Sequence, residues 1–223
     1  MNKEKLKIII TIVILALIAG ALYMFSTQKK VQVGESGETP IEQNTESDQD
    51  EPSISAQKPS VKSENQALFD KKMKEASGYF VKGDYRSAVA SYNQALAIIK
   101  SEHAYAGVYS ANLALKDYLN AEKAILSAIE LNPKSSDYWS WYLVLLSDGM
   151  KASRAKLDAV YNDAYNKVPD NRKVNIATAY ARILENLGDN AGAIGEWQKA
   201  IALNPSMKDA YQAEIDALKV KPQ

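Results

Sequence analysis

The sequence predicts an all-α fold of repeated helix pairs, preceded by one membrane-spanning helix and a disordered linker. Three observations predict it. Eighteen consecutive residues near the N-terminus, from Ile8 to Phe25, carry no charge. The following stretch, to about residue 62, is polar and acidic with almost no large apolar side chains. From Ser63 onward, apolar residues recur at spacings of three and four, and Gly and Pro punctuate the pattern, as in amphipathic helices.

Residues 1–30 are predicted to be a membrane anchor, with a transmembrane helix over about residues 7–26. A helix rises about 1.5 Å per residue, so roughly eighteen to twenty apolar residues cross a bilayer core. Three lysines precede the apolar stretch and two follow it. This small excess favours a single-pass protein with a cytoplasmic N-terminus and an extracytoplasmic folded domain.

A cleaved signal peptide is the alternative interpretation of the same segment. The small residues Ala19, Gly20 and Ala21 follow an apolar stretch and resemble a cleavage site. Cleavage near Ala21 would release a secreted protein. Apolar residues continue as far as Phe25, where a cleavable signal is usually polar, so the uncleaved anchor is the preferred hypothesis.

Residues 31–62 are predicted to form a disordered, acidic linker. They contain seven acidic residues against two lysines and are rich in Ser, Gln, Thr and Pro. Such a segment cannot bury enough apolar surface to offset its chain entropy. Its expected role is that of a spacer that holds the folded part away from the bilayer.

A repeated phrase dominates the remainder of the chain. Three similar ten-residue phrases end at Pro133, Pro169 and Pro205, which are 36 residues apart in both intervals (169 − 133 and 205 − 169). A fourth copy over residues 91–100 lacks only the proline. Each copy carries a small or apolar residue, then a larger side chain four later, then Ala: Ala88, Tyr92, Ala95; Ala121, Ile125, Ala128; Leu157, Tyr161, Ala164; Ala193, Trp197, Ala200.

Turn signals precede three of the four copies. They are Gly83-Asp84-Tyr85, Lys116-Asp117-Tyr118 and Gly188-Asp189-Asn190. Gly tolerates the left-handed backbone that ends a helix, and Asp caps the helix that follows. Ser63 and Gln66 fit a capping box that would open the first helix.

This pattern resembles the tetratricopeptide repeat, a helix–turn–helix unit of about 34 residues. The resemblance covers residues from about 65 to 205 in four units. It implies a right-handed solenoid of helix pairs, and residues 207–219 are expected to form a last helix, with Tyr211, Ile215 and Leu218, that covers the final unit. Residues 63–223 are therefore predicted to be a tetratricopeptide-repeat domain.

The first helices of the units fit the pattern with different turn lengths. The fourth unit fits directly, with Tyr180, Ala181 and Leu184 inward. The second unit fits if its turn is one residue shorter than usual, and the third fits if its turn is two residues longer than usual. The inward side chains are then Tyr109, Ser110 and Leu113 in the second unit, and Trp139, Tyr142, Leu143 and Leu146 in the third.

In this family the first helices line a groove that is the usual site for a partner peptide. One Arg and one Asn do not suit a clamp for a peptide carboxylate, so an apolar or helical partner segment is expected. In the second unit the stripe of Ala104, Gly107, Ala111 and Ala114 fits either this groove or close helix packing. The other candidate groove residues are Met73, Ser77, Phe80, Ser140, Val144, Ser147, Asn175, Thr178, Arg182 and Glu185.

Catalytic, cofactor and metal sites are not indicated anywhere in the sequence. There is no Cys and one His, His103, which fits a surface residue. No phosphate-binding Gly loop, paired-carboxylate motif or basic–aromatic patch for nucleic acid is present. The apolar run from Tyr138 to Leu146 fits a helix core rather than a ligand patch.

The expected function is therefore that of a membrane-tethered protein–protein interaction scaffold in a bacterial cell envelope, with no enzyme activity, cofactor or nucleic-acid partner. A secreted protein, and a ligand-binding or enzymatic protein built on the repeat scaffold, are the rival hypotheses.

Overall fold

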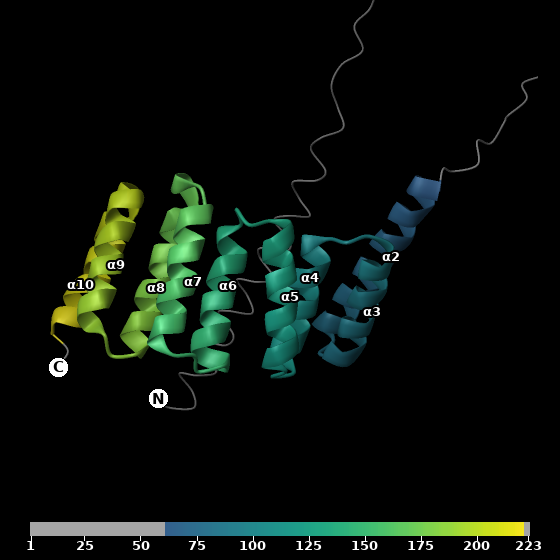
Figure 1. Ribbon diagram of the computed structural model, residues 1–223, viewed down its shortest axis with the longest axis horizontal. Helices are drawn as coiled ribbons and strands as arrows, with labels where there is room; N and C mark the ends of the chain where they lie inside the picture. Colours follow the sequence, from purple (N-terminus) through teal and green to yellow (C-terminus); the bar gives the residue numbers. More distant parts are fainter. Residues whose placement is uncertain (1–60, 221–223) are drawn as a thin grey trace, which may run out of the picture. The chain divides into compact units, whose positions relative to one another are not determined.

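The computed structural model describes residues 61–220, which are helical apart from short turns. Figure 1 shows the helices following one another in chain order from α2 to α10. The elements are α2 (Val61–Val81), α3 (Tyr85–Ile98), α4 (Glu102–Ala114), α5 (Tyr118–Leu131), α6 (Ser136–Val144), the π-helix η2 (Leu145–Gly149), α7 (Arg154–Lys167), the 3₁₀ turn η3 (Asp170–Arg172), α8 (Lys173–Asn186), α9 (Asn190–Leu203), the 3₁₀ turn η4 (Pro205–Met207) and α10 (Lys208–Lys219).

Each first helix packs on the second helix that follows it, and each second helix packs on the next first helix. The pairs are α2–α3, α4–α5, α6–α7 and α8–α9, and α10 then packs on α9. In α10 the expected apolar side chains cover that end, because Ile215 and Leu218 are buried and Tyr211 stacks on Trp197 at 5.5 Å between ring centroids.

The core is built from the small and large side chains that the repeated phrase predicts. Counted from the residue that caps each second helix, the fourth and eleventh positions are fully buried in every pair. Seven of these eight residues are alanines, which let neighbouring helices approach closely, and the larger side chain at the eighth position fills the space between pairs. The fully buried set is Ala88, Ala121, Leu157 and Ala193, then Ala95, Ala128, Ala164 and Ala200.

The turns between paired helices repeat one hydrogen-bonded motif. Gly83 has φ +79°, the N–H of Asp84 donates to the Tyr79 carbonyl at 3.0 Å, and the Asp84 carboxylate accepts from the Ser87 N–H at 3.1 Å. This is a Schellman motif joined to an N-cap. The other two predicted turns have the same motif, with Gly188 (φ +79°) or Lys116 (φ 60°) in the left-handed position.

The predicted register of the second unit is wrong by one residue. The Asp117 N–H donates to the Asn112 carbonyl in the same way as Asp189 donates to Leu184, so the two turns have equal length. As a result Val108, Tyr109 and Asn112 occupy the inward positions of α4. Leu113, which was expected to face inward, is exposed.

The third unit contains a π-helical turn. The chain widens over η2, Lys151 takes a left-handed φ of 53°, and Ser153 caps α7 by accepting from the Lys156 N–H. These extra residues are the longer turn that the sequence predicts. The four side chains expected to face inward, Trp139, Tyr142, Leu143 and Leu146, are all buried.

At the N-terminal end, the described chain is helical from Val61. Ser63 therefore lies inside α2, and the predicted capping box at Ser63 is wrong. The predicted anchor (1–30) and the linker up to residue 60 lie outside the described residues. Among the helices that the structure describes, none is both long enough and apolar enough to span a membrane.

Candidate interaction surfaces

The first candidate surface is the side of α2, α4, α6 and α8 that turns away from the second helices. Equal distances from the turn motif place side chains of successive first helices in register. We call this set the first-helix face: Met73, Ser77 and Phe80 of α2; Ala106, Ser110 and Leu113 of α4; Ser140 and Val144 of α6; Asn175, Thr178, Arg182 and Glu185 of α8.

Three residues of the small-residue stripe predicted for the second unit, Ala104, Gly107 and Ala111, serve helix packing, and the fourth, Ala114, is exposed. Ala104 and Ala111 are fully buried. A Cβ on Gly107 would lie 2.5 Å from ring carbons of Tyr92, so the α3 ring sits directly against the α4 backbone. The corrected register moves the exposed side of α4 by one residue and brings Leu113 and the exposed His103 onto it.

The α2–α6 end of the first-helix face is apolar. Leu113 is 37% exposed and Val144 is 40% exposed. Phe80 is half-buried, and its ring meets the Tyr85 ring edge-on at 5.3 Å. Met73 is half-buried against the core, and the Ser77 hydroxyl donates to the Met73 carbonyl at 2.9 Å.

The α8 end of the face is polar, and its side chains already contact α6, α9 and α10. Arg182 donates to Glu214 of α10 at 3.1 Å and lies 5.2 Å over the Trp197 ring, while Glu185 accepts the Trp197 indole N–H at 2.7 Å. Asn175 ties the face to α6 through Ser136 and Ser140, and its carbonyl also accepts from Thr178. Ser147 of η2, which was also predicted to line the groove, is buried, and its hydroxyl donates to Asp148.

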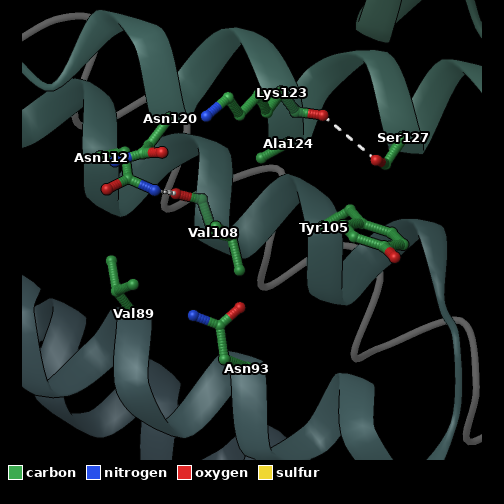
Figure 2. A pocket seen from close by; sticks show the side chains of 9 residues that line it. All are labelled: Val89, Asn93, Tyr105, Val108, Asn112, Asn120, Lys123, Ala124 and Ser127. Atoms are coloured by element: carbon green, nitrogen blue, oxygen red, sulfur yellow. Dashed lines mark hydrogen bonds between the residues drawn. The ribbon is translucent and has the colours of Figure 1, made fainter.

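A pocket of about 340 Å³ forms the second candidate surface. It opens between α3, α4 and α5, and Figure 2 shows Asn93 reaching from α3 toward α4. Its lining residues are Val89, Asn93, Tyr105, Val108, Asn112, Asn120, Lys123, Ala124 and Ser127. This pocket was not predicted from the sequence, although Val108 has a shorter side chain than Tyr142 and Tyr180, which occupy the same register in later units.

Shifted pKa values among residues 61–220 belong to helix caps, to side chains paired with an opposite charge, such as Glu75 with Lys72, and to buried tyrosines. Hydrogen bonds from Ser87 lower the pKa of Asp84, and the Arg154 guanidinium lowers that of Asp189. Burial raises the pKa of Tyr138 to about 12, with Glu102 and Asp137 adding to the effect. Within residues 61–220, no three His, Asp or Glu side chains are grouped so as to hold a metal ion.

Comparisons with known proteins show a likeness in fold. No protein-family model matches the chain, and no curated protein matches its sequence. Among solved structures, Pseudomonas aeruginosa PilF matches with a TM-score of 0.54 and 15% identity over 70% of this chain and 69% of that one. MamA matches with a TM-score of 0.52 and 18% identity over 67% of this chain and 89% of that one.

The third similar structure is TTC0263, a thermophilic TPR protein of Thermus thermophilus. Its TM-score is 0.53 at 16% identity, over 71% of this chain and 84% of that one. The turn motifs, the buried small residues and these three structures agree on one architecture. The described residues of this chain have the tetratricopeptide-repeat fold.

Proposed function

We propose that this chain is a membrane-tethered interaction scaffold whose first-helix face binds an apolar segment of a partner protein. The observation that carries the proposal is the presence of Phe80, Leu113 and Val144 on three successive first helices. Phe80 and Leu113 occupy the same position before their turns, and Val144 lies one helical turn earlier, in register with Ser110. The fold leaves Leu113 and Val144 more than a third exposed. Apolar side chains on the same side of successive first helices, within one helical turn of each other, can form one strip rather than isolated contacts.

The dimensions of the array suit a helical partner segment. Packed helices lie about 8–10 Å apart. In an α-helix, residues seven apart are separated by about 10 Å along the axis. A partner helix laid across the array, with an apolar residue every seventh position, would therefore place one side chain against each first helix.

A pair of charge substitutions tests this binding surface. Leu113→Lys with Val144→Lys places two ammonium groups on the apolar strip, and partner recovery from native membranes should fall at least about tenfold because apolar contacts are replaced by buried charge. The matched control is Leu119→Lys with Leu126→Lys on α5, where both side chains are also exposed. Equal loss in both variants would move the site away from the first-helix face.

The tether rests on the sequence of the anchor segment. Eighteen uncharged residues with lysines on both sides support a spanning helix, and the acidic linker would give the domain reach. Mass spectrometry of the mature N-terminus separates an anchored chain from a secreted one. A chain that starts at Leu22 would contradict the anchor. The display of the repeat domain outside the cytoplasm is tested by adding protease to spheroplasts, and a repeat domain that is protected from the protease would contradict it.

A further inference from the structure

The pocket between α3, α4 and α5 exists because four positions there carry smaller or shorter side chains than at the next two junctions. Counted from the turn motifs, each lining residue has two counterparts farther along the chain. The correspondences are Val89 with Glu122 and Asp158, Val108 with Tyr142 and Tyr180, Asn112 with Leu146 and Leu184, and Ala124 with Val160 and Glu196.

At both later junctions, a tyrosine of the protein itself bridges the corresponding helices. The Tyr142 hydroxyl of α6 donates to Glu122 of α5 at 3.0 Å. The Tyr180 hydroxyl of α8 donates in the same way to Asp158 of α7. Both phenol rings are buried. The first junction has valine at both corresponding places, so the tyrosine and its carboxylate partner are missing together.

The lining of the pocket has the chemistry to hold a phenol. Val89, Val108 and Ala124 give it an apolar side, as a ring requires. Asn93, Asn112 and Lys123 offer amide and ammonium groups, and none of the lining residues is acidic. The Asn112 side-chain N–H₂ already donates to the Val108 carbonyl at 3.0 Å, which leaves its amide oxygen to accept a proton from a hydroxyl.

We propose that this pocket receives a tyrosine side chain from a partner protein, in the place that Tyr142 and Tyr180 fill at the later junctions. The ring would lie against the two valines, and its hydroxyl would exchange hydrogen bonds with the asparagine amides and Lys123. The volume lies at the lower end of the range of about 300–1,000 Å³ for ligand pockets. The site is separate from the first-helix face, because α3 and α5 supply most of its walls.

The test measures binding of blocked glycine–tyrosine–glycine peptide to the full-length chain in detergent by ligand-observed NMR, beside the phenylalanine analogue and free p-cresol. The tyrosine peptide should bind at least about tenfold more tightly than the phenylalanine peptide, because only a hydroxyl satisfies the polar wall. Val89→Glu with Val108→Tyr installs the pair found at the later junctions and should abolish binding. A second filled variant, Asn112→Leu with Ala124→Val, should also abolish it if the first does not fold.

Three results would overturn the proposal. The first is equal binding of the tyrosine and phenylalanine peptides, and the second is undiminished binding of the tyrosine peptide by a folded filled variant. The third is binding of p-cresol but not of the tyrosine peptide, which would make the pocket a small-molecule site. The Leu113→Lys with Val144→Lys variant should bind the tyrosine peptide as the unaltered chain does. Failure of this pocket is therefore distinguishable from failure of the first-helix face.

Discussion

The Tyr161 hydroxyl of α7 donates a 2.6 Å hydrogen bond to the carboxylate of Glu196 on α9. Glu196 is only 7% exposed, and its other oxygen accepts from Lys199 at 2.7 Å. Each carboxylate oxygen thus has a donor, as a buried charge requires. The contact joins the second helices of neighbouring pairs, and the Tyr161 ring also stacks on Tyr180 at 4.4 Å between centroids.

Removing this hydroxyl should destabilise the domain. Tyr161→Phe leaves one oxygen of a buried carboxylate without its donor, so the free energy of unfolding should fall by about 1–3 kcal/mol. Urea denaturation measures the change. Tyr165→Phe is the matched control, since the Tyr165 hydroxyl makes no hydrogen bond in the described structure, and it should stay within about 0.5 kcal/mol of the unaltered chain. Equal effects of the two variants would refute the role of the pair.

Lys116→Gly should stabilise the domain. Lys116 holds a φ of 60°, where the two equivalent turns have glycine. A side chain costs about 1–2 kcal/mol in this conformation, and glycine's larger freedom in the unfolded chain offsets part of that. The free energy of unfolding should rise by about 0.5–1 kcal/mol in urea denaturation. The reverse change, Gly188→Lys, should lower it, and a stabilising effect there would contradict the explanation.

Gly107→Ala should destabilise the contact between the first two pairs. The added Cβ would lie 2.5 Å from the Tyr92 ring, so the ring or the helix must move, at an expected cost of about 1–3 kcal/mol. Gly195→Ala in α9 is the control, because a Cβ there meets nothing within 4 Å. That change should stabilise the protein by about 0.5–1 kcal/mol. Thermal melts of both variants give the comparison.

Stability should decline in alkali because several buried tyrosines hold their protons more tightly in the folded chain. Burial raises the pKa of Tyr109, Tyr161 and Tyr180, and raises that of Tyr138 to about 12. Above the unfolded pKa of about 10, the unfolded chain loses protons that the folded chain keeps, so unfolding becomes more favourable. This contribution is fully present below about pH 10 and is lost as the pH rises through the folded values.

Urea denaturation at a series of pH values checks this sign. The free energy of unfolding should fall between about pH 10 and pH 12, and the fall should be smaller in Tyr138→Phe, which removes one of the shifted groups. A free energy that stays level or rises over that interval would contradict the assignment of these rings to the core.

The sequence predicted the parts of the fold that depend on local residue types. Asp84 and Asp189 had to cap helices beside glycines with positive φ, and Ala95 and Ala200 had to be small where helices touch. The register of α4 could not be predicted in this way. Lys116 takes the left-handed position without being glycine, and Asn112 stands where Leu184 stands, so the apolar pattern pointed to Leu113 instead.

The candidate surfaces were less predictable because they depend on that register. The one-residue error placed the buried Ala111 on the first-helix face, where the structure has the half-buried Ser110. Arg182 and Glu185 were expected to face a partner, and only the folded arrangement shows that they contact α9 and α10 side chains. The pocket depends on a comparison of Val108 with two tyrosines that align only once the turns are known.

Site-specific photo-crosslinking in native membranes tests the central proposal most directly. One photoreactive residue replaces Val144 on the first-helix face, and a second, in a separate variant, replaces Leu126 on α5. The two positions are matched because Val144 is 40% exposed and Leu126 is 42% exposed. The account predicts a discrete protein adduct from position 144 that disappears with Leu113→Lys, and none from position 126. Adducts that form equally from both positions, or only from position 126, would contradict it.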